Sequence, residues 1–499
     1  MISVKRLFAP RCLAPALALG LSACAVLNPP LNQLRDSGPN DTARATPAGD
    51  EELWVGLAFS GGGMRASAFA HGVVEELRAM TARPGDPDGI LSELRLVTGV
   101  SGGSVTAAYY GLYGAGGVDR YRDGYLVQDA ERYMANNPIN PVTIARGVSG
   151  GANGRETFGR FLDEALFHGA TFGDLARRSS ITTWINATDV ANQTTFLFTP
   201  ETFDALCSDL ARFPISDAVA ASAAYPLVFS PIVVDTHQGD CAYRPPDWLT
   251  AARYNSEATG AMRAHAAALE SYASDPDMRF VKLLDGGITD NFGTTGLAVE
   301  RARAEAPHAP LSAREAVKLS RLLFLVADAG VEQPNGWTTR MQGPGGGQLA
   351  RAIVQSAMTA ASRTGFDAMR LQLDRWQEDL VDYRCSLTLA EVARLRGSAA
   401  GWDCRDLKFF VGMVSFDDLG GQMEDRLNAI PTRLALEEAE VDLSISAGRR
   451  TTRQNPEVNG FLASTARYGT DRLSAIDAGT ARRIAPVGGA RPIAPVSSE

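Results

Sequence analysis

The sequence predicts an α/β protein, and two observations carry that prediction. Short apolar stretches bounded by turn residues alternate with helical segments through most of the chain. Three glycine-rich turns also follow apolar, strand-like stretches directly; they read FSGGGMR (59–65), TGVSGG (98–103) and LLDGG (283–287). The candidate strands are 53–59, 94–100, 181–187, 280–284, 322–327 and 409–416.

Two longer helical stretches look like insertions into this pattern, around 248–274 and 348–380. The second places large apolar residues on one face at three- and four-residue spacing, from Phe366 to Leu380. We expect that helix to pack on the core. The alternative is a lid or a membrane-facing helix.

The first residues indicate export. Three basic residues, at positions 5, 6 and 11, precede an apolar run over 12–23 that is too short to span a bilayer. The run ends in LSAC (21–24), which resembles a bacterial lipobox and implies that Cys24 is acylated. The residue after Cys24 is Ala25; an aspartate there would oppose sorting of the lipoprotein to the outer membrane. The resemblance therefore implies an outer-membrane, lipid-anchored protein of the bacterial cell envelope. The alternative is an ordinary secretory signal.

Composition divides the chain into four parts. We expect a lipoprotein signal peptide over 1–23, a disordered tether over 24–50, one globular domain over 51–465, and a disordered tail over 466–499. The formal net charge is −9, which argues against a nucleic-acid partner.

Four cysteines remain once Cys12 and Cys24 are set aside, and an exported chain can oxidise them. They allow three pairings. We favour the neighbours in sequence, Cys207 with Cys241 and Cys385 with Cys404; the alternative is four free thiols.

The spacing Gly-x-Ser-x-Gly over 99–103 is that of a nucleophile elbow, which holds a serine on a sharp turn between strand and helix. Ser101 is therefore the candidate nucleophile. The glycines at 61–63 leave backbone N–H groups bare at a helix start, where an oxyanion could bind. Asp285 ends another strand before two glycines, and its carboxylate could accept the Ser101 proton.

A Ser-His-Asp triad is the competing arrangement. The chain has five histidines, and four of them follow Ser101 in sequence, as the α/β-hydrolase order requires. His308 lies in a polar loop with no strand leading to it. We interpret these histidines as surface or structural residues.

Taken together, the motifs GGGMR (61–65), GVSGG (99–103) and DGG (285–287) resemble those of the patatin-like phospholipase family, over about residues 53–293. The resemblance implies a three-layer α/β/α sandwich with helical insertions and a Ser–Asp dyad that needs no histidine. Ser101 would be the nucleophile and Asp285 the base. Gly61, Gly62 and Gly63 would form the oxyanion hole with Arg65.

Three departures from the family pattern limit which residue roles the resemblance implies. Ala66 follows Arg65 where glycine is usual, and His71 lies two places beyond the usual histidine. Asn291 fits a D-G-G-x-x-x-N pattern, but Gly293 replaces the common proline. Asn291 is therefore expected only to support the site.

The resemblance implies a serine acyl hydrolase that cleaves lipid esters or phospholipids through an acyl-enzyme, without a metal or cofactor. Cys24 would hold it on the membrane. Two alternatives stay open: a lipoprotein that binds lipid or a partner without turnover, and an acyltransferase that passes the acyl group to an alcohol.

Overall fold

A computed structural model describes residues 29–36, 38–40, 51–134, 153–226, 228–256, 258–304, 306–330, 337–465 and 467–468. Its described residues form an eight-stranded sheet in the order β5-β6-β3-β2-β1-β7-β8, with β4 paired to β3. The strands are β1 Leu53–Phe59, β2 Leu94–Val100, β3 Thr182–Asp189, β4 Thr194–Leu197, β5 Ile232–Asp235, β6 Phe280–Asp285, β7 Arg321–Asp328 and β8 Lys408–Ser415.

The centre of the sheet is parallel and one edge is antiparallel. Strands β3, β2, β1, β7 and β8 run parallel to one another. Strands β4 and β6 pair antiparallel with β3, and β5 pairs antiparallel with β6. All six expected strands form, with ends that differ by at most two residues. Strands β4 and β5 were not predicted, because each has four residues and is too short to show an alternation of apolar and polar side chains.

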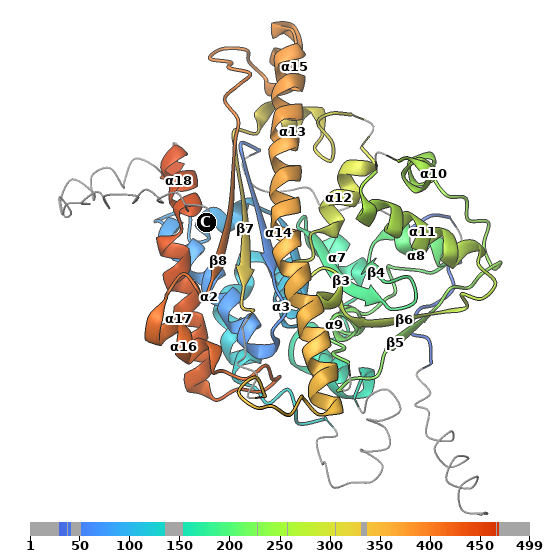
Figure 1. Cartoon of the computed structure of the whole chain (residues 1–499). Coiled ribbons are helices and arrows are strands. Elements are labelled where there is room, and N and C mark those ends of the chain that lie inside the picture. The colour runs from blue at the N-terminus through green and yellow to red at the C-terminus, as the bar shows by residue number, and fades with distance from the viewer. Residues whose placement is uncertain are drawn as a thin grey trace, which may run out of the picture.

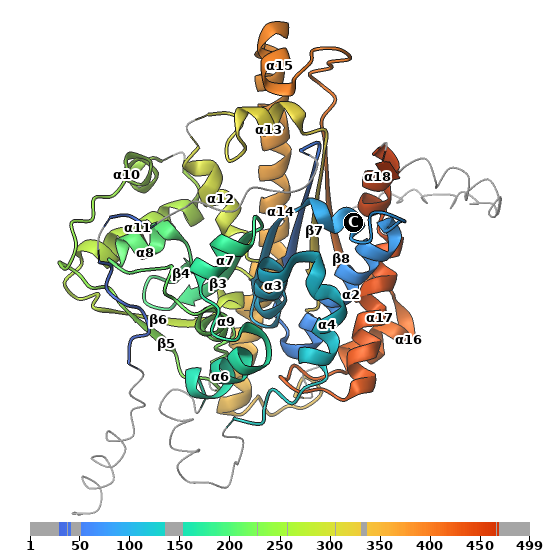
Figure 2. The same ribbon diagram turned by 180° about the vertical axis from the view of Figure 1, so that it is seen from behind.

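Helices cover both faces of the sheet, which confirms the three-layer α/β architecture (Figures 1 and 2). They are α2 Gly63–Thr81, α3 Gly102–Tyr113, α4 Val118–Tyr121, α6 Arg160–Leu162, α7 Phe172–Arg178, α8 Pro200–Ala205, α9 Ile215–Ser222, α10 Asp247–Tyr254, α11 Gly260–Ser274, α12 Thr295–Ala302, α13 Ala313–Lys318, α14 Gly346–Ser386, α15 Leu389–Arg396, α16 Gly421–Asn428, α17 Glu438–Gln454 and α18 Pro456–Ser464.

Alternation along β7 shows why both faces are covered. Leu323 and Leu325 enter the larger apolar cluster, which includes residues of α2, α3 and α17. Leu322 and Phe324 point to the other face and pack in a second cluster that contains Trp376 of α14. Because successive side chains of a strand point to opposite faces, a strand that is apolar throughout requires cover on both.

The expected insertions differ from the structure in detail. The stretch 248–274 is two helices, α10 and α11, because Asn255 leaves helical backbone geometry after Tyr254. The stretch 348–380 is one helix, α14, which begins at Gly346 and continues to Ser386. Its residues Met369, Leu373, Trp376 and Leu380 are buried, so this part packs on the core as expected.

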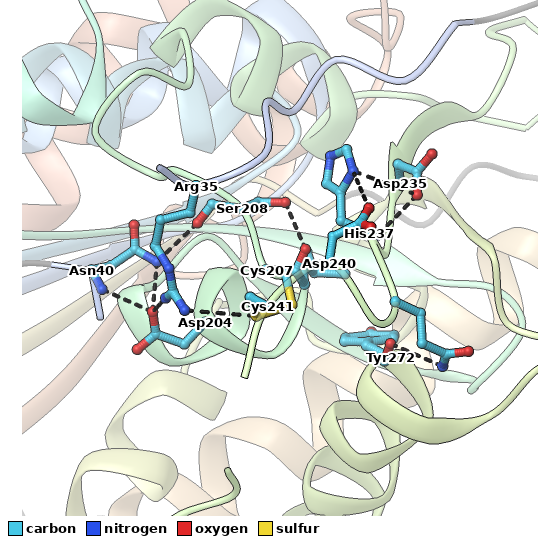
Figure 3. Close-up of a disulfide and its surroundings, with 12 residues drawn as sticks. Arg35, Asn40, Asp204, Cys207, Ser208, Asp235, His237, Asp240, Cys241 and Tyr272 are labelled. Carbon is cyan, nitrogen blue, oxygen red and sulfur yellow. Dashed lines mark hydrogen bonds and ion pairs between the residues drawn. A yellow bond between two sulfur atoms is a disulfide. The ribbon is translucent and has the colours of Figure 1, made fainter. Parts of the chain in front are cut away.

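The described part of the expected tether is packed on the domain rather than disordered. The Leu31 N–H donates to the Val233 carbonyl oxygen at 3.1 Å, which joins the segment to β5. The Asn32 side-chain amide donates to the Ser208 hydroxyl at 2.6 Å, and the Asn40 amide donates to the Asp204 carboxylate at 2.7 Å. Figure 3 shows Arg35 and Asn40 converging on Asp204 beside a disulfide. Polar composition suggested a tether, but these side chains find specific partners.

Both favoured disulfides are present, Cys207–Cys241 and Cys385–Cys404. The first lies beside the packed N-terminal segment (Figure 3), where the Arg35 N–H donates to the Cys207 carbonyl oxygen at 2.9 Å. The second ties the end of α14 to the loop before β8. The signal peptide, Cys24 and the tail beyond residue 468 lie outside the described residues. Among the described residues, every helix is too short or too polar to cross a bilayer.

The disulfides generate a stability prediction. The double variant Cys207→Ser/Cys241→Ser should lose roughly 3–4 kcal/mol of unfolding free energy, because the unfolded chain regains the entropy of a loop of 34 residues. Urea unfolding under oxidising conditions measures the loss. Peptide mapping that finds all four cysteines as free thiols in the native protein would contradict the assignment.

Candidate active site

Ser101 occupies the turn between β2 and α3 in a backbone conformation that side chains rarely adopt. Its φ is 53° and its ψ is −124°. Such strain costs about 1–3 kcal/mol and persists only when neighbouring contacts enforce it. Here the Ser101 N–H donates to the Ser222 hydroxyl at 2.9 Å, and Ser222 in turn donates to the Asn186 carbonyl oxygen at 2.6 Å. The elbow is thus held from α9 and β3.

The elbow packs directly against the glycine-rich loop that follows β1. A Cβ atom placed on Gly102 would lie 2.1 Å from the Gly63 carbonyl oxygen. One placed on Gly103 would lie 2.3 Å from the Phe59 carbonyl oxygen. Only glycine fits at these contacts, which explains the glycines after the nucleophile. Ser67 strengthens the junction by donating to the Gly102 carbonyl oxygen at 2.7 Å.

Asp285 lies at the end of β6 and faces the Ser101 side chain. Its carboxylate accepts a hydrogen bond from the Gly287 N–H at 2.9 Å, and only 1% of its surface is exposed. Burial raises the pKa of Asp285 to about 6, although hydrogen bonding with the Ser101 side chain and the Gly287 N–H lowers it in part. The carboxyl is therefore a stronger base than an exposed aspartate and is still ionised at neutral pH.

Asn291 links three parts of this site. Its side-chain oxygen accepts from the Gly61 N–H at 3.3 Å, and its amide donates to the Ser362 hydroxyl of α14 at 2.8 Å. A Cβ atom on Gly287 would lie 2.7 Å from the same Asn291 oxygen. The residue therefore supports the site as expected, by joining the glycine loop, the turn after Asp285 and α14.

The glycine loop offers its donors at the start of α2. Gly62 is the N-cap with φ 141°, and Gly63, with φ 63°, is the first helical residue. Backbone N–H groups in the first turn of a helix have no acceptor within the helix. Since the Gly61 N–H is directed to Asn291 and the Met64 N–H to the Arg433 carbonyl oxygen, Gly62 and Gly63 are the candidate donors for an anion.

Arg65 differs from the expectation that it would join the oxyanion hole. Its guanidinium donates to the carbonyl oxygens of Ala329 and Ile430 and to the Thr432 hydroxyl. The side chain is 1% exposed, and burial lowers its pKa to about 10, so it remains charged at neutral pH. Arg65 therefore ties the start of α2 to the segment after β7 and to the segment after α16. The motif pattern alone does not reveal this, because those acceptors are backbone groups far away in sequence.

Three of the five histidines have surroundings that do not involve Ser101. The His71 ring lies 2.6 Å from the Tyr110 hydroxyl and faces Glu75. His265 is buried, and burial lowers its pKa to about 4. The His308 ring lies 2.8 Å from the Leu311 carbonyl oxygen. None of the contacts described for these three rings involves Ser101.

Two contributions to the site were not expected from sequence. Ser222 contacts the Ser101 N–H, and its small polar side chain among alanines is the only signal of this in the sequence. Met358 of α14 reaches the site from a helix interpreted as core: a Cβ atom on Gly287 would lie 2.5 Å from its methyl carbon. Nothing in the sequence around Met358 pairs it with the D-G-G turn.

Fold and site together define an α/β protein with a strained serine elbow, a buried carboxylate partner and a glycine loop. Residues 57–298, just under half of the chain, match the family described as Patatin-like phospholipase. The segment 430–433, which contacts Gly63 and Arg65, lies outside the matched residues.

Similar solved structures include two proteins at low similarity. Human GIVD cytosolic phospholipase A2 is 15% identical with a TM-score of 0.30, and the match covers 56% of this chain and 44% of that one, less than half of its length. VipD from Legionella pneumophila is 13% identical with a TM-score of 0.29, covering 90% and 74%. A search of curated protein sequences finds no match.

The buried carboxyl predicts a pH dependence. Because its pKa is raised in the folded protein, the folded state binds this proton more tightly than the unfolded chain, and stability falls as pH rises from about 4 to about 6. Asp285→Asn removes the titration and keeps an acceptor for Gly287. The melting temperature of Asp285→Asn minus that of the wild type should therefore increase as the pH is raised from 4 to 7. A temperature difference that does not change with pH would contradict this account.

Proposed function

We propose that the protein is a serine acyl hydrolase that cleaves ester bonds of lipids through a Ser101–Asp285 dyad and an acyl-enzyme. The observation that carries the proposal is the strained Ser101 facing a buried carboxylate of raised pKa. The match of residues 57–298 to the patatin-like phospholipase family supports a lipid substrate.

In the first half-reaction the Ser101 hydroxyl oxygen attacks the ester carbonyl carbon, and its proton passes to Asp285. The carbonyl oxygen becomes an oxyanion, which the N–H groups of Gly62, Gly63 and Gly102 would stabilise. Residues at the start of a helix and after the nucleophile are suited to this role. The ester bond then breaks, and the proton on Asp285 passes to the leaving alcohol.

In the second half-reaction water attacks the acyl-enzyme. Asp285 accepts a proton from the water, the tetrahedral intermediate forms again, and its collapse releases the fatty acid while the proton returns to Ser101. An aspartate is a weak base for a hydroxyl group. A pKa of about 6 reduces the mismatch, and the aligned N–H groups stabilise the charge that develops on oxygen.

The dyad gives the main test. Ser101→Ala and Asp285→Asn should each remove nearly all turnover of a soluble short-chain ester, and the double variant should be hardly slower than either, because the two residues share one chemical step. A fluorophosphonate probe should label the wild type at Ser101 and label Asp285→Asn far more slowly.

The matched control is His308→Ala, which should retain turnover within about tenfold, equal to about 1.4 kcal/mol of activation free energy. The wild-type rate should also fall at low pH with an apparent pKa near 6 as Asp285 takes up its proton. If His308→Ala were inactive while Asp285→Asn kept its rate, a triad would replace the dyad.

We also propose that Cys24 carries the lipid anchor, on the basis of the LSAC stretch at 21–24, and that the protein belongs to the bacterial outer membrane. The chain purified from membranes should begin at Cys24, with a mass increase for three acyl chains, because stable anchoring needs more than one chain. Cys24→Ser should release it from the membrane fraction. An unmodified N-terminus in the soluble fraction of the wild type would disprove the anchor.

A further inference from the structure

The two halves of helix α14 differ in the charge and the burial of their side chains. Residues 346–366 contain two arginines, Arg351 and Arg363, and no aspartate or glutamate. The remainder carries five acidic residues and all of the side chains of the helix that are buried. The C-terminal half therefore has an ordinary core-facing role, whereas the N-terminal half needs a different explanation.

The N-terminal half of α14 lies over the candidate active site. Its Met358 methyl carbon approaches Gly287 and also lies 3.6 Å from the position of a Cβ atom on Gly61. Its Ser362 accepts the hydrogen bond from Asn291. This half of the helix therefore packs beside the glycine loop and the turn after Asp285; Figure 1 shows α14 in front of the sheet.

The opposite side of the same turns exposes large apolar side chains. Ile353 is 61% exposed and Leu349 is 49% exposed; they are four residues apart and so share one helix face. Met358 lies nine residues after Leu349, which places it about half a turn away, on the other face. Met341, just before the helix, is fully exposed. Arg340 is also exposed here, whereas Arg351 is exposed on the Met358 side of the helix.

We propose that this interfacial surface, formed by Met341, Leu349, Ile353 and Arg340, docks on a bilayer that contains anionic phospholipid. Exposed apolar side chains next to an arginine, without acidic residues, suit the boundary between headgroups and acyl chains. The segment 337–366 contains three arginines and no aspartate or glutamate, on a chain whose net charge is −9, so an anionic membrane would attract this part selectively. The inference rests on the proposed function and specifies that the substrate is taken from a membrane.

The start of the described chain supports the same orientation. Pro29 is separated from Cys24 by four residues, so an anchor there would hold Pro29 within about 18 Å of the membrane. Leu31, Asn32 and Asn40 are hydrogen-bonded to the domain, which limits how far the domain can move away from the membrane. In Figures 1 and 2 this segment begins toward the same lower side of the molecule as the first turns of α14.

A fluorophore tests the contact directly. In the full chain with Cys12→Ser and Cys24→Ser, an environment-sensitive label is attached to the cysteine of Ile353→Cys or, as the matched control, of Leu371→Cys. Leu371 is 60% exposed on the same helix but outside the interfacial surface. With vesicles of phosphatidylethanolamine and phosphatidylglycerol, the emission should shift to the blue at position 353 and not at position 371. No shift at 353, or equal shifts at both positions, would overturn the proposal.

An activity measurement links docking to catalysis. Leu349→Asp/Ile353→Asp should reduce fatty-acid release from these vesicles at least tenfold and leave hydrolysis of a soluble short-chain ester within twofold, whereas Leu371→Asp should change neither. A blue shift at 353 that needs high protein concentration and no vesicles would identify a second copy as the occupant and reject the membrane. If the wild type hydrolyses no ester, the proposed function fails, while the fluorophore still decides docking.

Discussion

The close packing of two backbone turns is the constraint on which the rest of the site depends. The elbow around Ser101 and the loop before α2 meet with carbonyl oxygens where Cβ atoms would otherwise lie, at Gly102 and Gly103. This contact, together with the hydrogen bond from the Ser101 N–H to Ser222, enforces the strained conformation of the serine. The same contact brings the start of α2 next to Ser101, so the candidate nucleophile and the candidate anion donors are positioned together.

The second constraint is electrostatic. Asp285 is buried with few hydrogen-bond donors around it, and its position at the end of β6 is set by pairing with β3 and β5. A carboxylate in this environment costs free energy that an exposed one does not, and that cost is the source of its basicity. A protein that used Asp285 only for structure would gain stability by satisfying it fully or by exposing it.

The site is completed by parts of the chain far from the three motifs. Arg65 and the Met64 N–H bind carbonyl oxygens of Ile430 and Arg433, which lie after the last strand, and α14 supplies Met358 and Ser362. The family match ends at residue 298, so the covering helix and the loop support come from this chain's C-terminal region. That region is where we place the membrane contact.

The sequence by itself determined the α/β class and the six longer strands, favoured the two disulfide pairs, and pointed to Ser101, Asp285 and the glycine loop as the candidate site. These follow from local rules, since apolar stretches, glycine turns and cysteine spacing act over a few residues or leave few alternatives. Only the tertiary structure decided that Arg65 faces backbone carbonyls, that residues 31–36 and 38–40 pack on the domain, and that Met358 lies beside Gly61 and Gly287. Each of these depends on a contact between residues distant in sequence, and no local pattern encodes which distant group a side chain will meet.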